Sequence, residues 1–372
     1  MPFFCLLQLG HWVGFLLDEV FFPRYRQVNI DSPVFITGIP RSGTTHLQRV
    51  LAQHEQFTTM MLWECLLAPS ITQRKCYRAV WRMGRRLLGW VRKPAVSLRR
   101  LLMLHFPSVK SPVRTWLERF SRIHALGLRE PEEDFVALIS VNACFLGVVL
   151  FPKVEWYWRL VQFDEAVDHS QRQVILTFYK RLLQKHMYFH DVAGRNEKLR
   201  YLSKNPSFLP WLNSLRDTFP KARFVLCARS PAAAVASQLS ALRPAWRLIH
   251  GSALPAFFVR RIVKMLAAFY VRVAAESDAH ASRGIKDKIV KDVIVVSLPD
   301  LASDLRATVT EIMLFLNMPS PVIFTRFLAH SMLKTRAYQS DHHYDLKEFA
   351  LDWRAIEIFF PKRFRSGAGV PA

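Results

Sequence analysis

The chain has 372 residues, of which 51% are hydrophobic and 13% aromatic, a composition that excludes an intrinsically disordered protein. It has 52 lysine and arginine residues against 29 aspartate and glutamate residues, and the net charge of +23 favours polyanionic partners such as anionic lipid, nucleic acid or phosphate-bearing small molecules. The five cysteines include no C-x-x-C pair, which argues against a disulfide framework and a zinc site.

The amino-terminal segment, residues 1–22, is apolar. Asp18 and Glu19 interrupt it before it reaches the roughly 20 residues that a membrane-spanning helix needs, so we expect an interfacial or core helix within residues 1–30. The segment also lacks the basic start and the small-residue cleavage site of a secretory signal. We therefore expect a cytoplasmic protein that has at most a peripheral contact with a membrane.

Residues 34–47 resemble a phosphate-binding loop from which one part is missing. An apolar run, residues 34–36, predicts a buried strand, and Gly38 and Gly43 have the spacing of the G-x-x-x-x-G-K-[ST] motif. Thr44 stands where that motif has its lysine. Because the lysine bridges the β- and γ-phosphates of a nucleoside triphosphate, its absence disfavours an ATPase or a GTPase.

The same loop keeps the groups that bind a tetrahedral anion. Its backbone amides precede a helix predicted over residues 44–53, so the positive end of the helix dipole lies behind them. Arg41 adds a fixed charge, and His46 is placed to contact a nucleotide. Further backbone and hydroxyl donors come from Ser42, Gly43, Thr44 and Thr45. The alternative is a tight turn that uses these residues for geometry alone.

The interval between residues 65 and 198 has a mainly helical pattern and forms either an elaboration on a sheet or a cap over the site. Its first part, residues 65–117, has no acidic residue, and its arginines and lysines are interleaved with aromatic and aliphatic residues. Such segments lie on anionic membranes, or they are ordinary helices whose charges face water. Residues 245–273 have the same composition and the same two readings.

Short apolar runs alternate with these helical patterns along the chain. We predict strands at residues 34–37, 57–60, 199–202, 223–228 and 293–297. Strands that alternate with helices are typical of a parallel sheet covered on both faces. The predicted fold is therefore an α/β, P-loop-like three-layer sandwich with a mostly parallel sheet and a large helical insertion, without a linker that would require a second domain.

A second anion site is predicted within residues 222–242. The strand there ends at Arg229, a Ser-Pro turn follows, and the next helix carries Ser237. A spacing of eight allows an arginine at a strand end and a serine on the following helix to bind one small anion from two sides. A nucleotide with phosphates on both sides of its ribose needs two such sites.

With these two motifs the chain resembles the sulfotransferases that use 3′-phosphoadenosine 5′-phosphosulfate (PAPS), and within them the bacterial-type branch. The family's P-R-S-G-T-T loop matches residues 40–45, and its Arg/Ser pair matches Arg229 and Ser237. Weaker matches are LWE (62–64), EPEEDF (130–135), LSKNPSFL (202–209) and the blocks at 298–319 and 344–352. The resemblance implies a sulfotransferase domain over residues 31–365, with the insertion at about 65–198.

The resemblance also implies the reaction: a sulfuryl group moves from PAPS to a hydroxyl or an amine, without a metal. The loop would bind the 5′-phosphosulfate, and Arg229 with Ser237 would bind the 3′-phosphate. Arg41 would stabilise the leaving phosphate, and Lys204, just past a predicted strand, would approach the transferring group. The glycine-rich block by which the cytosolic branch binds the 3′-phosphate is not found, so part of the nucleotide site stays unassigned.

The general base has to be a residue other than the family's usual histidine, because Phe208 stands at that position. We predict Glu64, which follows the second predicted strand. Desolvation beside residues such as Trp63 should raise its pKa, although Arg41 would lower it. One alternative is a structural glutamate paired with a loop arginine. Another is a histidine as the base, namely His46, His54, His186, His190, His342 or His343. The acidic residues at 130–134 either orient basic loops or cap a helix that begins near Asp134.

Two other classes remain open at this stage. An atypical P-loop kinase would need Mg²⁺, and Asp300 is the one acid in a position comparable to that of a Walker-B residue. A non-catalytic membrane- or nucleic-acid-binding protein would use the charge alone, but such a protein does not need two anion sites. The acceptor is a small molecule, lipid-like, aromatic or carbohydrate, and we expect no specific nucleic-acid partner. The sequence does not indicate an oligomeric state.

Overall fold

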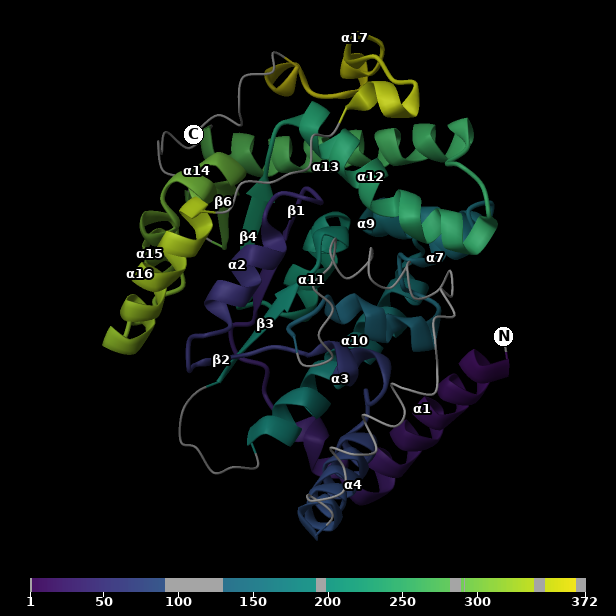
Figure 1. Cartoon of the computed structure of the whole chain (residues 1–372), viewed down its shortest axis with the longest axis vertical. Helices are drawn as coiled ribbons and strands as arrows, with labels where there is room; N and C mark the ends of the chain where they lie inside the picture. The colour runs from purple at the N-terminus through teal and green to yellow at the C-terminus, as the bar shows by residue number, and fades with distance from the viewer. Residues whose placement is uncertain are drawn as a thin grey trace.

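The computed structural model describes residues 2–90, 130–191, 199–281, 289–290, 292–337 and 345–365. Its centre is a six-stranded sheet in the order β2-β3-β1-β4-β6-β5 (Figure 1). The strands are β1 (Val34–Gly38), β2 (Phe57–Thr58), β3 (Arg200–Lys204), β4 (Arg223–Ala228), β5 (Ile289–Val290) and β6 (Val293–Ser297). Neighbouring strands pair in parallel except β5 and β6, which are antiparallel. The five predicted strands are confirmed, and the two-residue β5 was not predicted.

The register of the sheet brings the ends of three strands to one edge. Ile36 of β1 pairs with Lys204, the last residue of β3, and Gly38 pairs with Cys227 of β4. The loop after β1 therefore begins beside the carboxyl ends of β3 and β4. In parallel α/β sheets this edge, where strand order changes direction, is the usual position of a ligand site.

Alternation along β1 divides the core into two layers, because successive side chains of a strand point to opposite faces. Phe35 packs with helices α10 (His169–Asp191), α11 (Leu212–Thr218), α12 (Pro231–His250) and α13 (Ala256–Ala281). Val34 and Ile36 pack on the opposite face with α2 (Thr44–Leu51), α15 (Leu305–Phe315) and α16 (Val322–Ala337). Helices cover both faces of the sheet, which confirms the three-layer α/β prediction.

In the described part of the chain between β2 and β3 the regular secondary structure is helical, apart from one isolated bridge between Met61 and Pro131. It contains α3 (Leu62–Leu66), α4 (Ile71–Trp90), η2 (Asp134–Val141), α7 (Gly147–Leu150), α8 (Glu155–Arg159), η3 (Leu160–Gln162), α9 (Phe163–Ala166) and α10. Of the basic run at 65–117, residues 91–117 lie outside the described residues. The second basic segment belongs to α12 and α13, and since Phe258, Ile262 and Leu266 are buried, α13 is a core helix.

The remaining described helices lie before β1, between β3 and α11, and after β6. They are α1 (Pro2–Phe21), η1 (Pro23–Gln27), η4 (Pro206–Trp211), α14 (Leu298–Ser303), η5 (Leu346–Phe349), α17 (Trp353–Ile356), η6 (Glu357–Phe359) and η7 (Lys362–Phe364). Helix α1 lies within the predicted residues 1–30 and includes Asp18 and Glu19. Among the described residues it is the one helix whose length and composition would allow a membrane span, over Phe4–Phe21, and 22% of that stretch is buried.

Candidate active site

The loop between β1 and α2 is held in a shape that depends on its two glycines. Gly38 has φ +123°, and a Cβ there would lie 2.2 Å from the carbonyl oxygen of Cys227. Gly43 has φ +86°, and a Cβ would lie 2.9 Å from the side chains of Leu298 and Leu301. Larger residues would clash with neighbouring strands and helices, so these glycines fix the path of the loop.

Helix α2 begins directly after this loop with its positive end toward it. Gly43 is the N-cap and makes no side-chain cap hydrogen bond, so the amides of the first turn face the loop uncapped by a side chain. Ser42 is buried, and its hydroxyl donates to the carbonyl oxygen of Ile39 at 2.5 Å. Thr44 is buried and Thr45 is exposed. The geometry is that of an anion cradle, in which Ser42 also stabilises the turn.

The two predicted anion motifs meet at Arg41. Arg229 Nη1, at the end of β4, donates to the carbonyl oxygen of Arg41 at 3.0 Å. Arg41 Nε in turn donates to Ser237 Oγ of α12 at 3.3 Å. The carbonyl of Arg229 accepts a hydrogen bond of 2.7 Å from the hydroxyl of Tyr270 in α13. A single hydrogen-bonded chain thus joins the loop, the end of β4 and α12.

Lys204, at the carboxyl end of β3, is buried and is not a solvated surface lysine. It is 2% exposed, and its Nζ donates to Glu133 Oε1 at 2.6 Å. The neighbouring Asp134 is fully enclosed and accepts hydrogen bonds from Tyr179 at 2.8 Å, from Tyr201 at 2.6 Å, and from Ser203 and Asn205. Burial raises the pKa of Asp134, while these hydrogen bonds lower it. Glu133 and Asp134 therefore orient Lys204 and the end of β3. The prediction that the acidic residues cap the helix beginning near Asp134 is wrong, because the N-cap Glu133 makes no side-chain cap hydrogen bond.

Glu132 is a further carboxylate of this edge. Its amide donates to the carbonyl oxygen of Met60 at 3.1 Å, and its carbonyl accepts from Gln48 Nε2 of α2 at 3.4 Å. Burial raises the pKa of Glu132; Lys204 opposes this effect and Glu133 adds to it. Sequence reasoning treated Glu132 only as one member of an acidic run, since its environment depends on α2 and β3, which are distant in sequence.

Glu64 lies in a closed cluster. Its carboxylate is fully buried, accepts from the amide of Met61 at 3.0 Å and lies 2.9 Å from His190 Nε2. Arg74 Nη1 is 3.6 Å away and His186 Nδ1 is 3.7 Å away. Burial acts to raise the pKa of Glu64, but the Arg74 guanidinium and the hydrogen bond with His190 hold it far below its ordinary value. The expected rise in the pKa of Glu64 was therefore wrong. The arginine that lowers this pKa is Arg74 and not Arg41.

The donor atoms of Glu64, His186 and His190 lie within 4.8 Å of one another, close enough for a metal ion. Arg74 disfavours one, because its buried guanidinium lies 3.1 Å from His186 Nδ1 and already supplies the positive charge. The other nitrogen, His186 Nε2, is 2.8 Å from the hydroxyl of Thr58. Burial and His190 lower the pKa of His186, which keeps it neutral. The chemistry of this donor set fits an internal ion pair better than a metal.

His46 and Asp300 are the remaining candidates. His46 is half-buried on α2, and burial together with Arg49 lowers its pKa. Asp300 lies inside the first turn of α14, where its amide donates to Ser297 Oγ at 3.1 Å. It is not the last residue of a strand, as a Walker-B acid would be.

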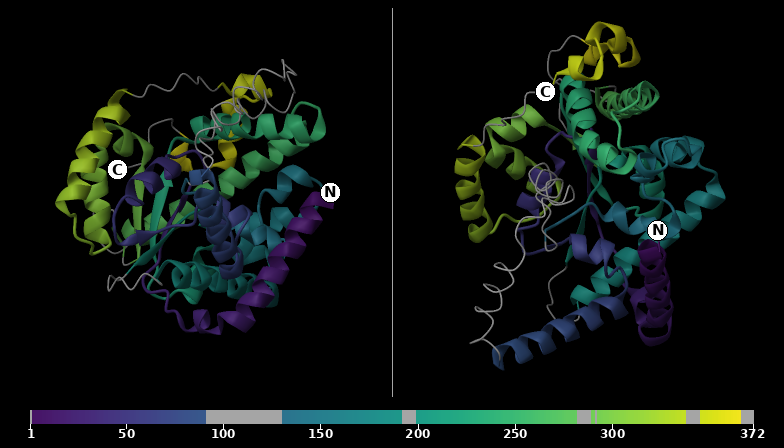
Figure 2. Two further views of the ribbon diagram at one scale, coloured as in Figure 1. Left: turned by 60° about the horizontal axis from the view of Figure 1, so that its bottom comes forward. Right: turned by 45° about the vertical axis from the view of Figure 1, so that its right-hand side comes forward.

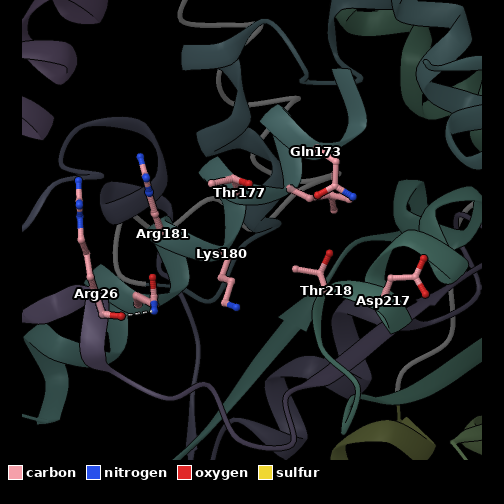
Figure 3. A pocket seen from close by; sticks show the side chains of 9 residues that line it. Arg26, Gln173, Thr177, Lys180, Arg181, Asp217 and Thr218 are labelled. Carbon is pink, nitrogen blue, oxygen red and sulfur yellow. Dashed lines mark hydrogen bonds between the residues drawn. The ribbon is translucent and has the colours of Figure 1, made fainter. Parts of the chain in front are cut away.

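A cavity of about 420 Å³ lies elsewhere, between η1, α10 and the end of α11. Figure 3 shows Arg26 and Arg181 on one side and Asp217 and Thr218 on the other. None of the predicted site residues lines this cavity. It is therefore separate from the edge of the sheet where the β1–α2 loop meets the carboxyl ends of β3 and β4, which we call the loop edge.

Comparisons with known proteins bear on the family and the fold. The model of a family described as the sulfotransferase family matches residues 33–321. Sulfotransferase STF9 from Mycobacterium avium superposes with a TM-score of 0.63 and 18% identity, covering 95% of this chain and 81% of that one. For sulfotransferase STF1 from Mycobacterium tuberculosis H37Rv the TM-score is 0.55, with the same identity and coverage. No curated protein sequence matches. The family match over most of the chain, on a fold shared with these enzymes, means that the protein belongs to the sulfotransferase family.

Proposed function

We propose that the protein transfers a sulfuryl group from PAPS to a hydroxyl or an amine of a small-molecule acceptor. The observation that carries the proposal is the hydrogen-bonded chain from Arg229 through Arg41 to Ser237. It joins two anion motifs at one sheet edge, as a nucleotide with a 5′-phosphosulfate and a separate 3′-phosphate requires.

In this proposal the loop holds the 5′ end of the donor. The amides of residues 41–45 at the start of α2 and the guanidinium of Arg41 bind the phosphosulfate, and Thr44, Thr45 and His46 lie beside them. Arg229 and Ser237 bind the 3′-phosphate. The fit is supported by Gly43, because its lack of a side chain keeps the backbone close to α14 and leaves the amides facing the loop.

The reaction has one bond-making and one bond-breaking event at sulfur. The acceptor oxygen loses its proton to a base and forms a bond to sulfur, and the bond between sulfur and the phosphate oxygen breaks, so that 3′-phosphoadenosine 5′-phosphate leaves with the electron pair. Arg41 and the loop amides stabilise that leaving phosphate. Lys204, held at 2.6 Å by Glu133, is an oriented hydrogen-bond donor on the neighbouring strand end, and the transferring group would share it with Glu133.

We propose Glu132 as the general base, with Glu64, the residue predicted from the sequence, as the alternative. A base near neutral pH works best when its pKa is raised toward the working pH. The pKa of Glu132 is shifted in that direction, and Glu132 is half-buried. Glu64 has a strongly lowered pKa and no exposed surface.

The acceptor class and the surroundings of the protein are proposals of the same kind. The aromatic content favours a hydroxyl on a lipid-like or aromatic molecule, and a carbohydrate hydroxyl is the alternative. We propose a cytoplasmic location with a peripheral membrane contact. A Mg²⁺-dependent kinase is less well supported, since Asp300 does not occupy a Walker-B position.

Transfer from radiolabelled PAPS in the presence of a chelator tests the proposal. Panels of hydroxylated lipids, phenols, sugars and amines serve as acceptors, and the label is followed into product. We expect metal-independent transfer to at least one class, and loss of transfer in the Arg41→Ala variant. Phosphate transfer from ATP–Mg²⁺ without any sulfuryl transfer would contradict the proposal.

A further inference from the structure

Helix α1 turns its polar residues toward the protein. Asp18 is fully buried and accepts hydrogen bonds from the amides of Ile71 at 2.9 Å and Thr72 at 2.8 Å, at the start of α4. Lys185 Nζ of α10 donates to Asp18 at 2.9 Å. One acidic side chain thus fastens α1 to two other helices.

Two further contacts repeat this arrangement along the helix. His11 is buried, with Nε2 lying 3.2 Å from the carbonyl oxygen of Leu66 and Nδ1 lying 3.0 Å from Gln73 Nε2. Glu19 pairs with Arg26 at 2.6 Å. The acids and the histidine of α1 are therefore satisfied by protein, and they are not the groups that α1 offers to its surroundings.

The outer face of α1 is apolar. Its exposed fractions are 67% for Leu6, 60% for Leu9, 50% for Trp12, 48% for Val13, 65% for Leu16 and 65% for Val20. At 3.6 residues per turn these six side chains fall within an arc of about 120°. A helix of a water-soluble protein normally has the opposite orientation, with its apolar arc inward. We call these six residues the α1 stripe.

Helix α1 lies at the periphery of the molecule in the views of Figures 1 and 2, and the six side chains of the stripe are exposed. Its carboxyl end is next to cations: Arg24 is exposed in η1, and the exposed Lys75 of α4 lies 4.0 Å above the ring of Phe22. The acidic residues of α1 are Asp18 and Glu19, which are paired inward. The charge that flanks the carboxyl end of the stripe is therefore positive.

We propose that the α1 stripe docks on the surface of an anionic lipid bilayer, with α1 lying in the interface and not crossing the membrane. Apolar side chains enter the acyl boundary while arginine and lysine stay at headgroup level. A crossing helix would have to release Asp18 and His11 from α4 and α10. A second copy of the chain is a poorer occupant, because each copy carries a net charge of +23 and two copies repel each other.

The six residues of the α1 stripe lie outside the basic run at 65–117, from which Lys75 alone is used here as a flanking cation, and their docking does not depend on the identity of the sulfuryl donor. The sequence left open whether the amino-terminal helix is interfacial or part of the core. One side of α1 is bound to the fold by polar contacts, and in this proposal the other side, with the stripe, is interfacial.

Vesicle co-sedimentation of the full chain tests the proposal, with phosphatidylcholine vesicles compared with vesicles that also contain phosphatidylserine. We expect binding to the anionic vesicles that weakens as salt is raised. The Leu9→Glu/Leu16→Glu double variant should bind roughly tenfold less or weaker still, because burial of two leucines is lost. Arg24→Gln and Lys75→Gln should each reduce binding to anionic vesicles roughly fivefold.

The matched control is Leu314→Glu/Ile323→Glu, which places the same charges at side chains that are 70% and 81% exposed on α15 and α16. It should bind as the wild type does. A labelled cysteine at Leu16→Cys, in a background where the exposed Cys5 and Cys76 are serine, gives a readout that does not depend on weakened binding. Its fluorescence should shift to the blue on anionic vesicles, and a label at Leu314→Cys should not shift.

Three results would overturn the proposal. They are equal wild-type binding to neutral and anionic vesicles, unchanged binding of the Leu9→Glu/Leu16→Glu variant, and a dimer of the wild type that this variant converts to a monomer without any vesicle binding. The last result would assign the α1 stripe to a second copy of the chain.

Discussion

Arg41 in the β1 loop and Arg74 in α4 are both held by hydrogen bonds, but their partners differ in charge. Arg41 donates to the neutral hydroxyl of Ser237, and the carbonyl of Arg41 accepts from Arg229. Arg74 is fully buried and faces the Glu64 carboxylate at 3.6 Å. A neutral acceptor orients a guanidinium without cancelling its charge, whereas a buried carboxylate cancels it. The loop edge is therefore suited to an incoming anion, and the Glu64 cluster is suited to holding α3, α4 and α10 together.

The largest expected effect is on kcat, and it distinguishes Glu132 at the loop edge from Glu64 in the buried cluster. Glu132→Gln should lower kcat by roughly 10²–10⁴-fold, the range for loss of a general base, and should leave nucleotide binding nearly intact. Glu64→Gln, assayed where both variants are fully folded, should keep kcat within roughly tenfold of the wild type. The reverse pattern of turnover would establish Glu64 as the base and Glu132 as a structural residue.

A substitution in the Glu64 cluster should instead change the stability of the fold. Glu64→Gln removes one partner of a buried ion pair and should lower the free energy of unfolding at neutral pH by about 3–5 kcal/mol, measured by urea titration. Because the folded-state pKa of Glu64 lies below its ordinary value of 4.5, this contribution is present above about that pH and is lost as the pH falls. The difference between variant and wild type should therefore shrink in acid.

The matched control for that experiment is Glu348→Gln. Glu348 pairs with Arg243 at 2.9 Å on the surface, where the two side chains are 43% and 45% exposed. Solvent screening limits such a pair to about 1 kcal/mol or less. An equal loss in the two variants would mean that burial does not strengthen the Glu64 cluster.

The next effect concerns the two ends of the nucleotide. Arg41→Ala and Arg229→Ala should each weaken binding of 3′-phosphoadenosine 5′-phosphate by about 1.5–3 kcal/mol, since each removes a charge-assisted phosphate contact. Only Arg229→Ala should lose the preference for a nucleotide that has the 3′-phosphate. If that variant keeps the wild-type ratio of the two affinities, Arg229 does not bind the 3′-phosphate.

The smallest effect is expected for Ser237→Ala. It removes one neutral hydroxyl and the acceptor that orients Arg41, so affinity should fall by about 0.5–1.5 kcal/mol in calorimetry. Ser240→Ala, three residues further along α12, is the control and should bind as the wild type does. A loss as large as that of Arg41→Ala would show that Ser237 has more than an orienting role.

The features that were predictable from the sequence are those that local patterns encode. Apolar runs located five of the six strands, and the spacing of Gly38 and Gly43 located the loop. The two-residue β5 has too little pattern to detect. The partners of Glu64 were not predictable, because Arg74 and His186 come from α4 and α10 and meet Glu64 only after folding. The burial of Lys204 likewise depends on Glu133, 71 positions away in the chain.

The α1 helix illustrates the same limit. From the sequence, Asp18 and Glu19 argued only against a membrane-spanning length, and the choice between an interfacial and a core helix stayed open. In the fold Asp18 pairs with Lys185 of α10 and Glu19 pairs with Arg26 beyond the helix end, contacts that the sequence pattern does not reveal. Charge position along a sequence therefore does not identify the face of a helix that is exposed.

The central claim is that the loop edge binds a nucleotide with phosphates at both the 3′ and the 5′ positions without a metal. Isothermal titration of the full chain with 3′-phosphoadenosine 5′-phosphate, in the presence of a chelator, tests this claim most directly. We predict saturable one-site binding that is much tighter than binding of adenosine 5′-phosphate and does not change when Mg²⁺ is added. Binding of ATP only in the presence of Mg²⁺, with no response to 3′-phosphoadenosine 5′-phosphate, would contradict it.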